Sequence, residues 1–460
     1  MKKAYNILLL FVAVVTAVGL TACKDEPDKY QIQDGTPTVH YVRPVGVASD
    51  SLITSAYLDN QICLVGENLR SITKLLFNDK EAILNTSYIT DNTLVVSVPG
   101  SIPGKVDNKI HMWNKDGVET LFDFNVLVPA PTILGMSNEY AKPGDDVQIL
   151  GNYFANDENV PLKATIAGKE IEISKITETA LYFTMPEGIA EGSIAVTTIY
   201  GTTESAFHYK ETRGIITNFD NPDHFKENSG TKGIIPQGWN LKPIYANVDG
   251  IDGYYVQVGD GNIVMPEDGG WTEEFKLSWW CGNWDGNPMG IKAGEGTPLR
   301  NVFGEDYFKK PANLALKFEL CIPATNPWKA GALQVLFVNN DQCANDTWQN
   351  NLYIKDTKSS QGEIDAKNLE IAPHKITGDL CRGIYRPWAT TGSFDTGGKL
   401  ITVTMPLADF IYNFDGTPGK YELTPESFDS FIMWPVSGGV NGTECTPILR
   451  YDNIRLVPIK

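Results

Sequence analysis

The sequence is poor in positive charge and has no cluster of basic residues. Its 38 Lys and Arg residues stand against 56 Asp and Glu residues, which gives a formal net charge of −18. A surface that binds nucleic acid needs clustered Lys and Arg to neutralise phosphates, so we expect no nucleic-acid partner. The same charge works against long-range attraction of acidic polysaccharides. Neutral ligands are the class that the composition leaves open.

Recognisable catalytic motifs are also lacking. The 5 His residues are scattered without metal-ligand spacing, and there is no G-x-S-x-G elbow, Walker loop or H-E-x-x-H motif. The nearest approach is GEIDAKNLE, where Glu363 and Asp365 would share one face of a strand. A retaining glycosidase needs a second carboxylate about 5–5.5 Å from the first. Lys367 and Asn368 stand where it is expected, and Glu370 would face the other side, so we predict that the chain is not an enzyme.

Cysteines and metal ligands are too sparse for a disulfide framework or a cofactor site. The sequence has 7 Cys, and those in residues 213–460 are odd in number, with no recognisable spacing. Asp249 and Asp252, in NVDGIDGYY, offer two carboxylates toward a structural Ca²⁺, which takes about six to eight oxygens. Two turn aspartates are the simpler interpretation, so we expect no cofactor and no metal.

The strongly apolar run of the sequence lies at its N-terminus. Lys2 and Lys3 precede it, the run covers residues 7–20, and LTAC follows, ending at Cys23. The run is shorter than the roughly 20 residues that span a bilayer, which is typical of an export signal. LTAC resembles a bacterial lipobox. The resemblance implies removal of residues 1–22 and acylation of Cys23.

A charged tether is expected to follow the signal, over residues 23–36. KDEPDK stands directly after Cys23 and resembles the signal by which Bacteroidetes lipoproteins are displayed on the outer face of the cell. The resemblance implies an outer membrane location, with a lipid anchor and a chain that faces the exterior. Several acyl chains on one Cys would make that anchor stable.

The rest of the chain reads as short strands divided by Gly, Pro, Asn and Asp, which predicts an all-β fold. An internal repeat is visible in the first half, where ICLVGENL and TLVVSVP correspond to VQILGNYF and ALYFTMP. Gly66 aligns with Gly151 and Pro99 with Pro186, a period close to one immunoglobulin-sized sandwich. These blocks resemble immunoglobulin-like domains of the TIG or IPT type. We expect two such sandwiches, at residues 37–128 and 129–212.

The composition changes near residue 213. Nine of the 10 Trp lie in residues 213–460, among strands such as LALKFEL and ALQVLFV that are separated by long loops rich in Gly, Asn and Pro. A block of this length can bury one large core. We predict a larger jelly-roll-like β-sandwich over residues 213–460.

Trp residues in the loops of this block are candidates for stacking on a sugar. Trp and Tyr offer flat apolar faces with a hydrogen-bonding edge, and an unpartnered Trp in a loop is an exposed apolar liability. Trp239, Trp271 and Trp434 are interpreted mainly as packing residues. The predicted contacts are Trp280, Trp284, Trp328, Trp348, Trp388, Tyr385, Arg386, Asn345, Asp346 and Gln349.

These features together resemble Bacteroidetes surface glycan-binding lipoproteins. Residues 213–460, with RPW and GSFDTGGKLITVTMPLADF, are similar to the xyloglucan-binding domain of surface glycan-binding protein B. The resemblance implies a non-catalytic protein that captures a β-glucan-type polysaccharide (xyloglucan, mixed-linkage glucan or mannan) for an outer-membrane transporter complex of the starch-utilisation type. Two alternatives stay open: a surface adhesion or scaffold protein whose Trp-rich loops bind protein, and a glycoside hydrolase of unrecognised type.

Overall fold

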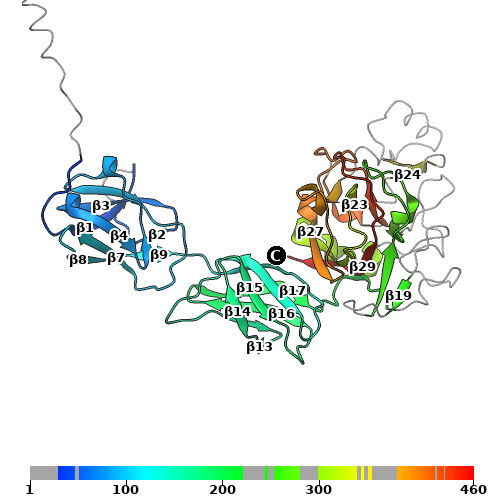
Figure 1. Cartoon of the computed structure of the whole chain (residues 1–460), viewed down its shortest axis with the longest axis horizontal. Coiled ribbons are helices and arrows are strands. Elements are labelled where there is room, and N and C mark those ends of the chain that lie inside the picture. Colours follow the sequence, from blue (N-terminus) through cyan, green and yellow to red (C-terminus); the bar gives the residue numbers. More distant parts are fainter. Residues whose placement is uncertain are drawn as a thin grey trace, which may run out of the picture. The chain divides into compact units, whose positions relative to one another are not determined.

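The computed structural model describes residues 30–46, 51–220, 244–246, 253–279, 299–338, 343–346, 351–354, 381–419, 422–428 and 430–459. Regular structure in these residues is almost entirely β, which confirms the all-β prediction (Figure 1). Within this part of the chain, no helix is long and apolar enough to cross a membrane. The short helical elements are α2 (Leu299–Phe303), η1 (Leu69–Ser71), η2 (Thr86–Tyr88), η5 (Glu273–Phe275), η6 (Glu305–Phe308), η7 (Pro311–Asn313), η9 (Pro387–Ala389), η10 (Leu407–Asp409) and η11 (Pro425–Ser427).

The first sandwich packs one three-stranded sheet on one four-stranded sheet. Alternation places side chains in the core: in KIHMWN, Ile110 and Met112 are buried and their neighbours are half-buried. The sheets have the orders β1-β3-β6 and β5-β4-β7-β8, and β2 pairs with β9. The strands are β1 (Thr38–Pro44), β2 (Ser55–Tyr57), β3 (Gln61–Glu67), β4 (Ile72–Phe77), β5 (Lys80–Glu81), β6 (Thr93–Ser97), β7 (Lys109–Asn114), β8 (Glu119–Asp123) and β9 (Asn125–Leu127).

The second sandwich repeats this plan with one strand more in its first sheet. Its sheets have the orders β10-β11-β15-β14 and β13-β12-β16-β17. Ile149, Leu181 and Ile194 are fully buried between them. The strands are β10 (Thr132–Met136), β11 (Asp146–Asn152), β12 (Lys163–Ile166), β13 (Lys169–Glu170), β14 (Ile173–Ile176), β15 (Ala180–Thr184), β16 (Gly192–Thr198) and β17 (Gly201–Tyr209).

The two glycines that align in the repeat, Gly66 and Gly151, both allow neighbouring strands to approach each other closely. Gly66 lies opposite a bulge in β1, and a Cβ built on it would lie 1.8 Å from the carbonyl oxygen of Thr38. Gly151 lies opposite a bulge in β10, where a Cβ would lie 1.9 Å from the carbonyl oxygen of Thr132. Only glycine lets the two backbones approach this closely.

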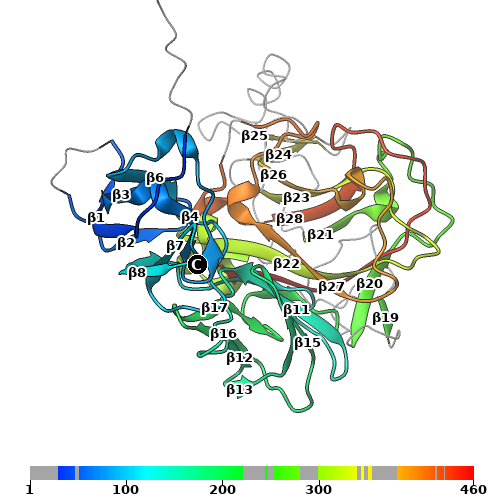
Figure 2. The same ribbon diagram turned by 60° about the vertical axis from the view of Figure 1, so that its left-hand side comes forward.

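The C-terminal sandwich has two larger sheets (Figure 2). One has the order β19-β20-β29-β22-β27, with β18 also paired to β29, and the other has the order β21-β28-β23-β26; β24 and β25 form a separate pair. The strands are β18 (Ile215–Thr217), β19 (Ile244–Ala246), β20 (Tyr254–Val258), β21 (Leu277–Trp279), β22 (Leu314–Cys321), β23 (Ala332–Val338), β24 (Cys343–Asp346), β25 (Asn351–Ile354), β26 (Arg382–Tyr385), β27 (Ile401–Pro406), β28 (Ser430–Val436) and β29 (Leu449–Pro458).

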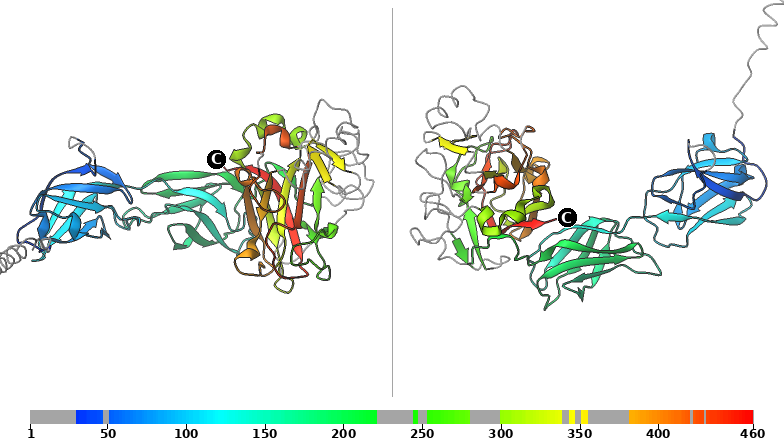
Figure 3. Two further views of the ribbon diagram at one scale, coloured as in Figure 1. Left: turned by 90° about the horizontal axis from the view of Figure 1, so that it is seen from above. Right: turned by 180° about the vertical axis from the view of Figure 1, so that it is seen from behind.

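Strand β22 is buried on both faces, which explains its sequence LALKFELC. Leu316 and Phe318 point into the core of the C-terminal sandwich. Lys317 and Glu319, also fully buried, alternate with them and face the second sandwich. The second and C-terminal sandwiches accordingly form one compact unit, which covers residues 131–154 and 162 onward; residues up to 130, with 155–161, form another. Figure 3 shows the sandwiches from two further directions.

Candidate functional site

An exposed tryptophan lies in the segment that leads into β21, an edge strand of the C-terminal sandwich. Trp271 is 53% exposed. Gly269 and Gly270, which precede it, have positive φ angles of 87° and 59°, so the chain turns sharply there. A Cβ on Gly269 would lie 2.6 Å from the Cα of Gly331, so no larger residue fits. Phe275, four residues further on, is fully buried and anchors the segment.

Two other aromatic rings hold Trp271 in place without covering it. Its ring stacks on Phe414 with a centroid distance of 4.7 Å and an interplanar angle of 24°. Trp434, on β28, meets it edge-on at 5.1 Å and 77°. The indole Nε1 of Trp434 donates to the carbonyl of Thr272 at 3.1 Å, which ties β28 to the Trp271 segment. We call these three rings, Trp271, Phe414 and Trp434, the aromatic platform.

The loop that carries Phe414 adds polar groups next to the aromatic platform. Gln334 Nε2 donates to the carbonyl of Phe414 at 2.9 Å and fixes the loop on β23. Asp415 is exposed and accepts hydrogen bonds from the hydroxyl of Thr417 at 2.6 Å and from its N–H at 2.9 Å. These bonds lower the pKa of Asp415. A flat apolar ring beside a fixed carboxylate and a hydroxyl can stack on a sugar and bond its hydroxyl groups.

Two buried cations contact rings of the aromatic platform. Arg382 is buried, and its guanidinium lies 5.4 Å from the ring centroid of Phe414. Burial lowers the pKa of Arg382 to about 9. Lys276 Nζ lies 5.0 Å from the ring centroid of Trp434. These cations stabilise the two rings through cation–π contact.

Two of the predicted sugar contacts are core residues instead. Trp328 is 0% exposed and Trp388 is 3% exposed. The Nε1 of Trp388 donates to the carbonyl of Gly331 at 2.7 Å, and the Nε1 of Trp328 donates to the carbonyl of Ala330 at 2.5 Å. Each indole thus satisfies its polar edge internally and packs its faces in the core, so neither offers a surface to a ligand. This corrects the prediction for both residues.

Tyr385 and Arg386 are brought close to these core residues. Tyr385 lies 6.2 Å from Trp328, ring to ring, and burial raises its pKa to about 12. Arg386 NH1 donates to the carbonyl of Gly438. Both side chains are only partly exposed. They are not part of the aromatic platform.

The side chains of the other predicted contacts lie outside the described residues. Asn345 and Asp346 lie on β24, whose side chains are outside the described residues. Trp280, Trp284, Trp348 and Gln349 also lie outside them, as do Cys23, Asp249, Asp252 and the stretch GEIDAKNLE.

Trp271 is the residue that sequence interpretation missed. The sequence pattern favours a packing role for it, yet it stands in PEDGGWTEE, between a Gly-Gly turn and acidic residues. This turn context is the same as that of Trp284 in CGNWDGNP, and it is the signal in the sequence that points to Trp271.

The described residues contain one cluster with the composition of a metal site, and it is an ion pair instead. Glu191, His208 and Glu211 bring their ligand atoms within 4.8 Å of one another. Glu211 is fully buried, and its carboxylate accepts from Arg213 Nε at 2.8 Å and NH2 at 2.7 Å. Burial raises the pKa of Glu211, but the bonds from Arg213 outweigh it and lower the pKa overall. A cation would have to displace this guanidinium.

An exposed, rigidly held aromatic platform on a β-sandwich is typical of carbohydrate-binding proteins. Comparison with known proteins agrees with this class. Residues 209–458 match the family described as the surface glycan-binding protein B xyloglucan binding domain. The crystal structure of surface glycan-binding protein B from Prevotella bryantii is similar, with 36% identity, 93% of this chain and 100% of that chain covered, and a TM-score of 0.71.

A curated IPT/TIG domain-containing protein of Bacteroides ovatus is 26% identical over 234 residues, which is 46% of this chain and 46% of that one. The alignment therefore spans less than half of that relative. The chain belongs to the surface glycan-binding protein B family. It is accordingly a non-catalytic glycan-binding protein of the cell surface, which confirms the predicted resemblance and overturns the hydrolase alternative.

Proposed function

We propose that this protein captures a neutral β-glucan-type polysaccharide, with xyloglucan as the first candidate and mixed-linkage glucan or mannan as others, through its C-terminal sandwich. One observation supports this most strongly. The part of the chain that matches the xyloglucan-binding domain also carries Trp271, a half-exposed indole fixed by Phe414 and Trp434.

The chemistry of the aromatic platform suits a neutral sugar chain. The axial C–H groups of a β-linked glucan make apolar faces that stack on an indole, and its equatorial hydroxyls meet groups such as Asp415 and Thr417 at the rim. The net charge of −18 gives no attraction to anionic ligands. Because Phe414 and Trp434 hold the Trp271 ring before binding, little conformational entropy is lost when the ligand stacks.

The proposed role also depends on a location at the cell surface. An acyl group on Cys23 would hold the chain at the outer membrane, facing the exterior, and the two immunoglobulin-like sandwiches would act as spacers. Weak binding by single copies would be strengthened by surface density. The captured polysaccharide would pass to an outer-membrane transporter complex of the starch-utilisation type.

Affinity electrophoresis tests the proposal. Residues 24–460 are run through gels that contain xyloglucan, mixed-linkage glucan, galactomannan or no glycan, beside Trp271→Ala and a control, Trp113→Ala, in the first sandwich. Retardation of the unaltered chain and of the control, with clearly weaker retardation of Trp271→Ala, is the expected result. Full retardation of Trp271→Ala would move the site to Trp280, Trp284 or Trp348. No retardation in any gel would favour adhesion to another protein.

A further inference from the structure

The first sandwich differs from the second beside β6. In the second sandwich, β14 lies along the outer edge of β15 and completes the sheet. In the first sandwich β6 is the edge strand. The equivalent connections run over residues 82–92 and 171–179, between matching backbone hydrogen bonds, so the first is two residues longer. Its chain forms η2 where the second sandwich forms β14.

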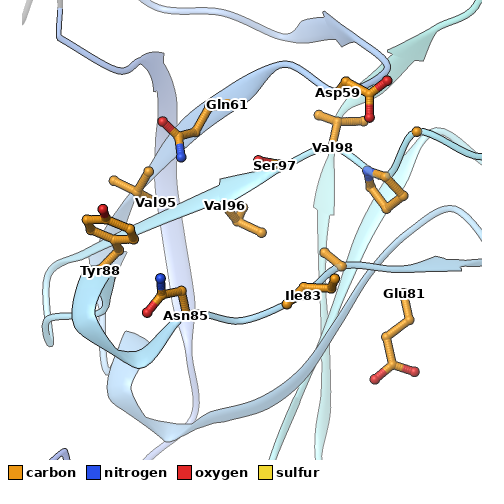
Figure 4. Close-up of a pocket in the computed structure, with 13 residues that line it drawn as sticks. Asp59, Gln61, Glu81, Ile83, Asn85, Tyr88, Val95, Val96, Ser97 and Val98 are labelled. Carbon is orange, nitrogen blue, oxygen red and sulfur yellow. The ribbon is translucent and has the colours of Figure 1, made fainter.

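This difference opens a groove of about 430 Å³ beside β6, which we call the first-sandwich groove. Ile83 and Tyr88, from the longer connection, line it and are 91% and 54% exposed. Gln61 and Ser97 also line it. Figure 4 shows Tyr88 with Gln61 and Asn85 toward one end and Asp59 with Ile83 toward the other. The groove thus combines an aromatic ring, aliphatic side chains, two amides and two carboxylates, those of Asp59 and Glu81.

One carboxylate of the groove belongs to Asp59, whose backbone has an uncommon conformation. Its φ angle is 62°, in the left-handed region, and its N–H donates to the carbonyl of Val98 at 3.1 Å. The equivalent residue of the second sandwich is Gly144, with φ 93° and the matching bond to Met185 at 2.9 Å. Asp is one of the few non-glycine residues that adopt this conformation, because its short polar side chain can hydrogen-bond locally. It gives the first sandwich a carboxylate at the end of the groove, where the second sandwich has no side chain.

The turn at the other end of the groove is also held in place. Asn85 Oδ1 accepts from the backbone N–H of Ser87 at 3.1 Å and caps η2, the element that carries Tyr88. The backbone that carries Tyr88 is therefore a capped turn rather than a loose loop. Because this backbone is ordered before binding, less conformational entropy is lost when the ring stacks on a flat apolar face.

A sugar suits the groove better than an added peptide strand. Strand addition needs a run of open backbone groups, and β6 has only five residues. Pro99 follows it and has no N–H to donate, and Ile89 bridges to Leu94 at the other end. The length of β6 with open backbone groups is therefore short. By contrast, Gln61, Asn85 and Asp59 offer the donors and acceptors that sugar hydroxyls need.

We propose that the first-sandwich groove is a second glycan subsite, in which the ring of Tyr88 stacks on a neutral β-glucan-type sugar and Gln61, Asn85 and Asp59 bond its hydroxyls. The inference rests on the proposed function of the chain and adds to it. A polysaccharide chain long enough to reach both sites would be held with higher avidity than a short oligosaccharide.

Isothermal titration calorimetry on residues 24–460 tests the proposal, with a xylogluco-oligosaccharide and a mixed-linkage heptasaccharide as probes. The unaltered chain is compared with Tyr88→Ala and with Tyr57→Ala, a control in the same sandwich that is 55% exposed and does not line the groove. Because both tyrosines are exposed, we expect all three proteins to be folded, which thermal unfolding checks.

The expected result is two oligosaccharides per chain for the unaltered protein and for Tyr57→Ala, and one for Tyr88→Ala. Equal stoichiometry in all three proteins, with binding retained, overturns the subsite and leaves the proposed function standing. Absence of binding in every protein overturns both. Unchanged glycan binding, together with Tyr88-dependent cross-linking to the transporter, would assign the groove to a protein partner and also overturn the subsite.

Discussion

The guanidinium of Arg455, on β29, lies 2.7 Å from the carboxylate of Glu139, in the second sandwich, and both side chains are 0% exposed. Arg455 also pairs with Glu319 at 2.8 Å, and Lys317 pairs with Glu139. The cluster holds two carboxylates and two cations, so its charges balance. Burial lowers the pKa of Arg455, but the charges of Glu319 and Glu139 outweigh it and raise the pKa. The second and C-terminal sandwiches are thus joined by a closed ionic cluster.

Apolar contacts and backbone hydrogen bonds also join the second and C-terminal sandwiches. Val457, near the end of β29, belongs to the core cluster of the second sandwich. The N–H of Glu139 donates to the hydroxyl of Thr402 at 2.7 Å, and the N–H of Thr402 donates to the carbonyl of Ser137 at 2.9 Å. The C-terminal sandwich is therefore not expected to fold properly without its neighbour.

Glu139→Gln should destabilise the protein strongly. The change leaves Lys317 and Arg455, both 0% exposed, with one carboxylate between them, and breaking a buried ion pair in this way costs about 3–5 kcal/mol. Chemical denaturation measures the free energy of unfolding. Glu158→Gln, which removes an exposed partner of Lys105, is the control and should change stability by less than about 1 kcal/mol. Similar effects for the two variants would contradict the account.

Truncation should also show that the C-terminal sandwich depends on the second sandwich for its stability. Residues 131–460 keep Glu139, whereas residues 213–460 lose it and also expose Val457. We expect the longer fragment to unfold cooperatively and the shorter one to be less stable or aggregated. Circular dichroism and calorimetric melting compare the two. A cooperative melt of residues 213–460 at the same temperature would show that the junction is dispensable.

Gly151→Ala should be poorly tolerated. The new Cβ would lie 1.9 Å from the carbonyl oxygen of Thr132, so β10 and β11 would have to separate. We expect a loss of about 1–3 kcal/mol or more, as for other overpacked sites. Gly135→Ala is the matched control on β10, since a Cβ there meets nothing within 4 Å. Thermal unfolding ranks the variants, and equal melting temperatures would refute the close approach.

Phe414→Ala should weaken glycan binding without removing the indole that binds. The stacked contact between Phe414 and Trp271 is worth about 0.5–1.5 kcal/mol, which corresponds to a loss in affinity of about 2- to 12-fold if it only positions the ring. Titration calorimetry with a xylogluco-oligosaccharide measures the affinity. Tryptophan fluorescence should also shift, because the Trp271 ring becomes freer. An unchanged affinity would separate the aromatic platform from binding.

The stability of the first sandwich should depend on pH through His111. Its Nδ1 lies 2.8 Å from Glu119 and its Nε2 lies 2.7 Å from Asp107. Burial lowers the pKa of His111, but these hydrogen bonds and charges outweigh it and raise the pKa above its ordinary value. The stabilisation is then fully present below the unfolded pKa, about 6.5, and is lost as pH rises through the higher folded pKa.

His111→Gln tests this dependence. Melting temperatures of the unaltered chain and the variant are compared between about pH 5 and about pH 9, and the advantage of the histidine should shrink as pH rises past about 6.5. An advantage that stays constant across this range would contradict the raised pKa.

The all-β fold and the repeat could be predicted because local signals carry them. Gly66 and Gly151 aligned in the sequence, and the structure shows the same bulge and the same close carbonyl at each. Short strands ending at Pro or Gly were equally visible. Such features depend on neighbouring residues and need no knowledge of distant contacts.

The candidate site was less predictable, because exposure depends on tertiary packing. Trp388 follows a Pro in a loop-like stretch, yet η9 turns its indole inward to the carbonyl of Gly331. The partners of Trp271 lie far along the chain, at Phe414 and Trp434. The same holds for Lys317, whose charge looks out of place in an apolar strand until Glu139, 178 residues away, is brought against it.

The measurement that tests the central claim most directly is affinity electrophoresis of residues 131–460 in gels with and without xyloglucan or mixed-linkage glucan. This fragment keeps the ionic junction and the aromatic platform and omits the first sandwich. Retardation that depends on the glycan and is clearly weaker in Trp271→Ala is the predicted result. A folded fragment that migrates identically in every gel, while residues 24–460 are retarded, would contradict the assignment of binding to the C-terminal sandwich.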